Sequence, residues 1–423
     1  MFYLARLGLC HIAVLLISLL LSQSVLAEEL TLDEVFRLAK AASPEFGAAE
    51  FRLSGARALE KGAGALTNPQ VRLSATPVGQ AENGANSIVQ SLEVAGQRGL
   101  RSRAAQAQVS LSSLLVEQTL RQTLFDAGVL YYDYWQAHQA SLVTVEQVAL
   151  AEALVQTARK RYEVGEIALA EVQRVELNLA QANQTKVSAL ASESISLVQL
   201  NLRLGRPTEA PLEQPGRSLP ELPRAPGYEP LDLELPDLLS RAEYRPEYGI
   251  SQEQIHQARL GAKLASRAGY PDLELSLLQP NLGRSAGSVQ LSVVFPLFDW
   301  GGLGAEVAQK EQEVKALELE AQVQTRTIQF EIEEAWIRYR EAKKRREISE
   351  DVATGYLALA DRARLGYEAG VLTLVEVIDQ QNAYRQALLS WISAETDFQK
   401  AALQVRWVSF LPMAPQTERL DLL

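Results

Sequence analysis

The strongest constraint in this 423-residue sequence is that it contains two diverged copies of one pattern. Residues 43–74 align without gaps on residues 245–276, and ten of the 32 positions are identical. A second match pairs residues 161–182 with residues 366–387, which carry the same Tyr-Glu-x-Gly motif. Two long copies indicate duplication of a large unit, because solenoid proteins repeat much shorter ones.

Each copy combines a short β region with very long helices. Alternating apolar and polar residues predict one β-hairpin at about 70–95 and another at about 272–296. Residues 98–162 contain no proline and predict one long helix. Residues 304–367 predict a similar helix, in which Gly355 and Gly366 are expected interruptions. A further helical stretch follows each of them, so each copy predicts a long antiparallel helical hairpin.

The chain divides into five parts on this basis. Residues 1–27 carry a basic residue, a short apolar core and a small-residue cleavage site, which predict a signal peptide; a retained signal anchor is the alternative. The first repeat is predicted at 28–204 with its helical hairpin at 98–204, and the second at 237–411 with its helical hairpin at 302–411. A proline-rich linker is predicted at 205–236 and a tail at 412–423.

Composition excludes several classes of protein. The fraction of hydrophobic residues, 47%, is that of a folded chain, and the net charge of −11 argues against a nucleic-acid binder. The single cysteine, Cys10, falls in the predicted signal peptide, so the mature chain forms no disulfide.

The sequence offers no convincing catalytic or metal site. The segment Gly283-Arg-Ser-Ala-Gly287 fits a hydrolase pattern, but it lies in a predicted hairpin loop and not in a strand-turn-helix elbow. His138 and His256 lack the spacing of metal ligands. We therefore expect no enzyme, no cofactor and no dedicated metal site.

The predicted strands constrain assembly. A single chain offers two hairpins, and open sheet edges are not tolerated in lipid, so several copies would have to pool their strands to cross a membrane. The alternative is a periplasmic coiled-coil scaffold whose hairpins never enter lipid.

At this point the residues resemble a known family. The segment Arg161-Tyr-Glu-Val-Gly165, its echo Gly366-Tyr-Glu-Ala-Gly370 and the segment Phe295-Pro-Leu-Phe-Asp-Trp-Gly-Gly302 look like the TolC-type outer-membrane efflux proteins. The order of these elements and their duplication extend the resemblance over about residues 30–411. The turn Leu204-Gly-Arg-Pro207 looks closest to the heavy-metal branch similar to CzcC.

The resemblance implies a mainly α fold with a membrane β-barrel part. Three copies would form a twelve-stranded barrel in the outer membrane of a Gram-negative bacterium, above a periplasmic α-helical tunnel. The implied function is a passive exit duct of a tripartite efflux system for small molecules or metal ions. Its implied partners are a periplasmic adaptor (membrane fusion protein) and an inner-membrane pump of the RND type. A duct for type I protein secretion is the alternative within transport.

The resemblance also implies three groups of functional residues. The turns of the helical hairpins would be tips where the adaptor docks: Tyr162, Glu163, Gly165, Tyr367, Glu368 and Gly370. The junction of barrel and tunnel would hold Phe295, Pro296, Phe298, Trp300 and Gly301.

The third group is a gate at the narrow periplasmic entrance. Glu376 and Asp379 have i, i+3 spacing, so both carboxylates lie on one helix face, and a trimer would present six of them. Their first-repeat equivalents are Glu171 and Arg174, and we expect Arg174 to pair with an acid on a neighbouring helix. Leu372 stands where the family's best-known member has a clasp arginine, so the closing contacts here must differ.

Overall fold

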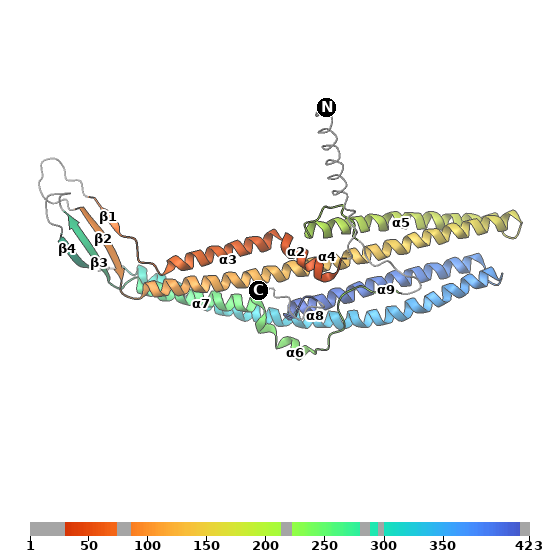
Figure 1. Ribbon diagram of the computed structural model, residues 1–423. Coiled ribbons are helices and arrows are strands. Elements are labelled where there is room, and N and C mark those ends of the chain that lie inside the picture. The colour runs from red at the N-terminus through yellow and green to blue at the C-terminus, as the bar shows by residue number, and fades with distance from the viewer. Residues whose placement is uncertain (1–29, 74–85, 213–221, 280–287, 295–299, 415–423) are drawn as a thin grey trace, which may run out of the picture.

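The computed structural model describes residues 30–73, 86–212, 222–279, 288–294 and 300–414. The predicted signal peptide, the junction residues Phe295, Pro296 and Phe298, and most of the predicted tail lie outside the described residues. The described chain is elongated, with a β-sheet at one end and two helical turns at the other (Figure 1).

Two helices run almost the full length of the molecule. They are α4 (Gln97–Glu163) and α8 (Gly302–Glu368), each of 67 residues, or about 100 Å at 1.5 Å per residue. Each turns back into a 35-residue helix, α5 (Leu169–Arg203) or α9 (Leu374–Val408). The mainly α fold predicted from the sequence is confirmed.

The expected interruption of the second long helix is wrong. Helix α8 continues through both Gly355 and Gly366. A glycine inside a helix costs about 1 kcal/mol relative to alanine, an amount that packing along such a long helix can offset. Gly366 also has a packing reason, because a Cβ atom there would lie 2.9 Å from the side chain of Leu372.

The shorter helices flank the two long ones. In the half nearer the sheet, α3 (Pro44–Ala63) packs on α4, and α7 (Pro246–Arg267) packs between α4 and α8. In the other half, α5 packs on α4, and α9 packs between α4 and α8. Each half is therefore a layer four helices wide, with α8 along one edge and α3 or α5 along the other (Figure 1).

Three short elements complete the helical part. Helix α2 (Leu32–Ala42) packs on α4, and α6 (Leu235–Leu239) and the 3-10 helix η1 (Ala242–Tyr244) pack on α8. Among the described helices, none combines the length and the apolar content that a membrane span requires.

The strands of both repeats form one antiparallel sheet. Its order is β1 (Gln70–Arg72), β2 (Asn86–Glu93), β3 (Asp272–Gln279) and β4 (Ser288–Val294). The central pair is β2 with β3, so the first hairpin and the second are joined edge to edge. Within the described residues, the outer edges of β1 and β4 have no strand beside them.

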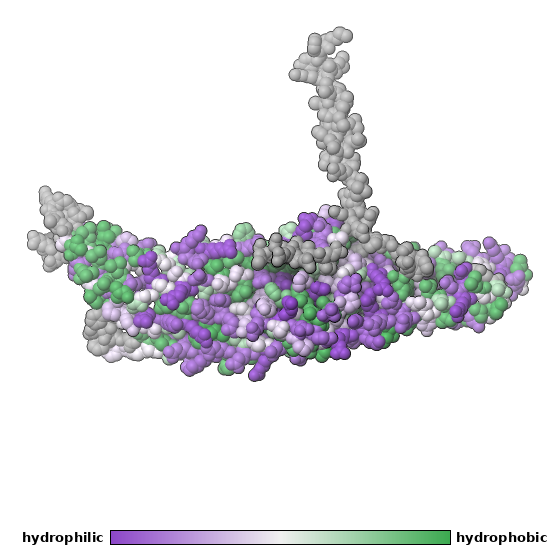
Figure 2. All heavy atoms as spheres, turned by 60° about the horizontal axis from the view of Figure 1, so that its bottom comes forward, coloured by the Kyte–Doolittle hydropathy of each residue, from purple (hydrophilic) through white to green (hydrophobic). Residues whose placement is uncertain are grey.

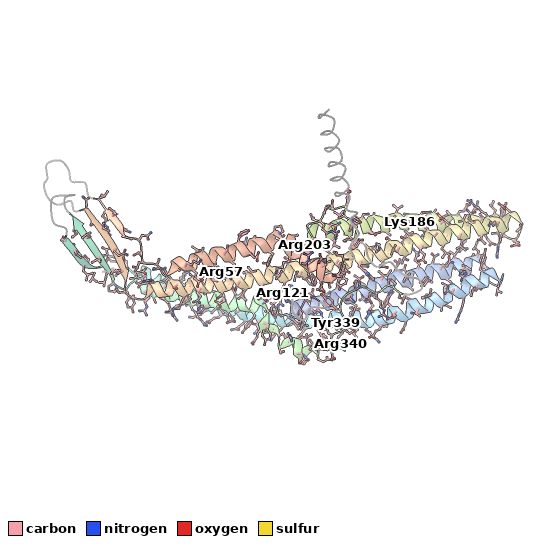
Figure 3. All side chains as sticks on the ribbon, in the orientation of Figure 1. Arg57, Arg121, Lys186, Arg203, Tyr339 and Arg340 are labelled. Carbon is pink, nitrogen blue, oxygen red and sulfur yellow. The ribbon has the colours of Figure 1, made fainter. Side chains whose placement is uncertain are left out.

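The main core lies at mid-length, where α9 ends. Arg121, labelled near mid-length in Figure 3, donates hydrogen bonds to the carbonyl oxygens of Arg406, Trp407 and Leu411, at 2.9, 3.1 and 3.3 Å. Its guanidinium also stacks on Phe410. These carbonyls follow the last helical hydrogen bonds of α9, and a cation there complements the helix dipole. Burial lowers the pKa of Arg121 to about 10, so the cap stays charged at neutral pH.

The linker between the repeats is fastened to this core. The indole Nε1 of Trp391 donates to the carbonyl oxygen of Pro223 at 2.9 Å, and the Tyr228 backbone N–H donates to Gln399 Oε1 at 2.7 Å. Gly227 lies so close to α4 that a Cβ atom would meet the hydroxyl of Tyr132 at 2.1 Å. Residues 222–231 thus pack across the helices of the bundle as an extended segment.

Candidate functional site

The two helical turns have the same backbone structure. After α4, the N–H groups of Gly165 and Glu166 donate to the carbonyls of Tyr162 and Arg161, both at 2.9 Å. This is the hydrogen-bond pattern of a Schellman motif, which requires a left-handed residue at the helix end. Gly165 supplies it with a φ of 76°.

The turn after α8 repeats this pattern. The N–H groups of Gly370 and Val371 donate to the carbonyls of Tyr367 and Gly366, at 3.0 and 2.8 Å, and φ of Gly370 is 75°. A Cβ atom would meet nothing within 4 Å at either glycine, so these glycines are needed for backbone conformation and not for space. The Tyr-Glu-x-Gly motif that the two repeats share therefore forms two turns of the same backbone structure.

The two tip tyrosines are not equivalent. Tyr162 is 44% exposed, whereas Tyr367 is 7% exposed and packs in a small core that includes Val155, Ala158 and Val172 of the first hairpin. Burial raises the pKa of the Tyr367 hydroxyl. Tyr162 can contact a partner directly, and Tyr367 instead joins the two hairpins of its own chain.

Arg161 makes the contact that links the tips. Its guanidinium carbon lies 4.2 Å from the ring centroid of Tyr367, and its Nη2 donates to the Tyr367 carbonyl oxygen at 3.4 Å. Glu166, in the turn of its own hairpin, lies 3.9 Å from Arg161 Nε. Arg161 begins the tip motif in the sequence, but the motif alone does not indicate this role.

The tips also present small apolar patches. Val164 and Val371 are among the most exposed hydrophobic residues of the chain, and hydrophobic colour reaches that end of the molecule in Figure 2. Neither valine was singled out from the sequence. Glu163 is exposed beside this patch, and the side chain of Glu368 lies outside the described residues.

The first gate acid caps its own helix. The Thr373 backbone N–H and its hydroxyl both donate to Glu376 Oε2 at 2.8 Å, and the Glu376 N–H donates to Thr373 Oγ1 at 3.4 Å. This is a capping box, and its Thr-x-x-Glu signature was readable in the sequence. The hydrogen bonds from the backbone and side chain of Thr373 lower the pKa of Glu376, so its carboxylate is ionised at neutral pH.

The other three gate residues lie close to the same turns. Asp379 is exposed on α9, one helical turn beyond Glu376. Glu171 is half-buried and Arg174 is exposed at the start of α5. Among the described residues of this one chain, Arg174 forms no ion pair, and its pairing with an acid on a neighbouring helix stays a prediction. Nearby, an ion pair between Arg159 and Glu176 at 2.6 Å links α4 to α5.

The opposite end of the molecule is an amphipathic sheet. Val71, Ile88, Leu277 and Val289 stand directly opposite one another across all four strands and are all exposed. The alternate face carries mainly polar residues, including an ion pair between Arg72 and Glu274 at 3.4 Å. Figure 2 shows the hydrophobic residues gathered over this sheet, in contrast to the hydrophilic helical body.

The described part of the junction is exposed. Trp300 is 94% exposed with a φ of 50°, and Gly301 follows with a φ of 85° as the residue that precedes helix α8. Gly96 has the same place before α4, with a φ of 78°. Left-handed residues therefore set the angle at which both long helices leave the sheet.

Comparisons with known proteins agree with this architecture. Residues 245–408 match the family model described as outer membrane efflux protein. The outer membrane efflux protein BepC of Brucella suis biovar 1 is 22% identical over 314 residues, which is 70% of this chain and 64% of BepC. This chain thus matches slightly less than two thirds of that relative's length.

Solved structures share the fold over nearly the whole chain. The CmeC outer membrane channel of Campylobacter jejuni has a TM-score of 0.73 at 15% identity, covering 92% of this chain and 87% of CmeC. The outer membrane protein VceC of Vibrio cholerae has a TM-score of 0.72 at 15% identity, covering 90% of this chain and 96% of VceC.

Proposed function

We propose that this chain, which resembles the TolC-type outer membrane efflux proteins, is the outer-membrane exit duct of a tripartite efflux system. Three copies close into a duct that conducts small molecules or metal ions passively from a pump to the exterior. The observation that carries this proposal is that one chain forms an incomplete strip, with open edges in both its sheet and its helical layer.

The sheet supports closure between copies. A four-stranded sheet with one exposed apolar face and two free edges has unpaired backbone groups that lipid cannot satisfy. Joining β4 of one copy to β1 of the next satisfies both edges at once. Three copies supply twelve antiparallel strands, which exceeds the eight of the smallest single-chain membrane barrels.

The helical layer supports the same closure. Phe51 and Leu59 are exposed on α3 at one edge, and Phe330 and Ile337 are exposed on α8 at the other. Exposed apolar residues along both edges of a layer are typical of surfaces that another copy covers. A ring of three layers buries both edges, so the helices form a tunnel continuous with the barrel.

We propose that Glu376 and Asp379 line the periplasmic entrance of this tunnel. In a trimer they form a ring of six carboxylates, which favours cations over anions. Glu171 and Arg174, at the equivalent turn of the first repeat, lie beside this ring, where Arg174 can pair with an acid of a neighbouring helix. The capping hydrogen bonds of Thr373 keep Glu376 ionised, against the repulsion of the other acids.

The test of the duct is single-channel conductance of the purified protein in a planar bilayer. The wild-type protein should form cation-selective pores that multivalent cations block. The variant with both Glu376→Gln and Asp379→Asn should lose selectivity and block while the assembly stays intact. If the wild-type protein forms no pores, the proposed duct is wrong. If the double variant forms pores with unchanged selectivity and block, these two acids do not line the lumen.

The partners of the duct follow from the exposed tips. We propose that a periplasmic adaptor of an RND-type pump docks on the hairpin turns, where Tyr162 and Val164 are exposed beside Glu163. A photo-crosslinking residue at position 162 should capture the adaptor in cells that express the whole system. The same residue at the buried position 367 should not, and it serves as the matched control. Equal capture at both positions, or none at 162, would contradict docking at the turns.

A further inference from the structure

A cavity of about 150 Å³ lies between the two helical hairpins, and its lining begins beside the gate residues at Ile378 and Asn178. Its walls come from residues 143–151 of α4, Asn178 of α5, residues 357–364 of α8 and residues 378–388 of α9. These four helices make up the tip half of the molecule (Figure 1), and all of them contribute to the lining. We refer to it as the inter-hairpin cavity.

The interior of the inter-hairpin cavity has a large apolar part. Val143, Ala151, Ile378 and Leu388 line it and are buried. A cavity of about this volume with such walls accepts a molecule the size of benzene. The apolar walls therefore favour an organic body over a hydrated inorganic ion.

Two arginines line the inter-hairpin cavity, Arg364, which is exposed, and Arg385. Arg385 lines it and is half-buried, and its Nε atom is buried without an acceptor among the described residues. Burial lowers the pKa of Arg385, because the guanidinium has lost water without gaining an anion. The acids that line the same cavity, Glu146 and Asp361, are exposed at its rim.

Two side-chain amides lie close to this arginine in the lining. Gln147 Nε2 donates to Asn382 Oδ1 at 3.4 Å, and Gln147 Oε1 is buried without a donor among the described residues. The amide of Asn382 remains available to donate to a ligand. Arg385 Nε is a buried donor, so a ligand that supplies an acceptor is favoured there, whereas Gln147 Oε1 needs a donor such as a bound water.

We propose that the inter-hairpin cavity binds a small organic anion with an apolar body, of the class of aromatic monocarboxylates. The carboxylate accepts from Arg385 Nε and from the Asn382 amide, and the ring occupies the space between Val143, Ile378 and Leu388. This proposal requires only the fold of one chain and does not depend on the export function.

Binding at this place affects the arrangement of the hairpins. The ligand contacts α4 of the first hairpin and α9 of the second at the same time. A movement that separates the hairpins opens the cavity and removes those contacts. The anion therefore binds the present arrangement more tightly than a separated one and shifts the population toward it.

Isothermal titration calorimetry of the detergent-purified full-length protein with benzoate tests the proposal. Benzamide, its neutral isostere, is the comparison ligand. Benzoate should bind saturably and at least about tenfold more tightly than benzamide, as expected for a hydrogen bond to a charged group.

Three variants separate the cavity from non-specific effects. Arg385→Gln should weaken benzoate binding by about tenfold or more, and Ala360→Met should abolish it by filling the cavity while Arg385 is retained. Arg362→Gln removes an exposed arginine of α8 outside the cavity and should leave binding unchanged. The proposal would be overturned if benzoate did not bind saturably, or if benzamide bound as tightly as benzoate. It would also be overturned if Arg385→Gln and Ala360→Met bound benzoate with wild-type affinity.

Discussion

At the residue scale, Arg161 shows why a sequence repeat is an incomplete guide to a site. The repeat treats Tyr162 and Tyr367 as equals, but Arg161 covers only Tyr367, because that ring faces the neighbouring hairpin. The repeated Tyr-Glu-x-Gly motif predicted both turns. Which tyrosine is buried depends on how α4 and α9 pack, and local sequence does not contain that information.

The Arg161 contact predicts an effect on opening. Arg161→Ala removes the cation–π contact and the hydrogen bond that join the tips, worth about 1 kcal/mol at a partly exposed site. The ratio of open to closed channels should rise about fivefold, measured as open time in single-channel recordings.

A neighbouring arginine provides the matched control. Arg159→Ala breaks only the pair with Glu176 inside the first hairpin and should leave open time near wild type. Equal effects of the two substitutions would mean that Arg161 does not hold the entrance closed.

Thr373 is a residue that sequence reasoning could have found. The Thr-x-x-Glu signature of a capping box stands directly before an apolar-periodic helix, yet Glu376 was assigned to the gate alone. The structure gives its carboxylate two hydrogen bonds from Thr373, which fix its position at the start of α9. The Glu376 side chain is thereby held in one orientation.

At the scale of elements, the strands were predicted from alternation, but their pairing was not. Two separate hairpins follow from periodicity, whereas the pairing of β2 with β3 joins residues about two hundred positions apart. Gln90 interrupts the apolar row of β2, and its Nε2 is satisfied by the carbonyl oxygen of Thr67 at 2.7 Å. The interruption is therefore a satisfied polar contact and not the end of a strand.

Adjacent residues of β4 test which face of the sheet meets lipid. Val289 belongs to the exposed apolar row, and Gln290 points to the polar face. Val289→Lys should reduce the amount of protein inserted in the outer membrane, since a lysine on a lipid face costs about 2–4 kcal/mol near the bilayer midplane.

Gln290→Lys places the same charge on the other face and should insert normally. Fractionation of outer membranes and quantification of the folded protein compare the two variants. Normal insertion of Val289→Lys, or failure of both variants alike, would contradict the assignment of the faces.

At the scale of the whole molecule, the absence of proline over two long segments predicted the length of α4 and, apart from the breaks wrongly expected at Gly355 and Gly366, that of α8, and with them the elongated shape. The side-by-side packing of the repeats into one strip, four elements wide, was not readable from either repeat. It arises from long-range contacts of α4 with α7 and α9, for example where Gly128 lets α9 approach so closely that a Cβ atom would lie 2.7 Å from Leu403.

We propose that this strip becomes a duct only when three copies pool their strands and helices. Native mass spectrometry of the protein purified from outer membranes in mild detergent measures this directly. We expect a single assembly of three chains whose circular dichroism retains the β signal of the sheet. A monodisperse monomer that retains that full β signal would contradict it.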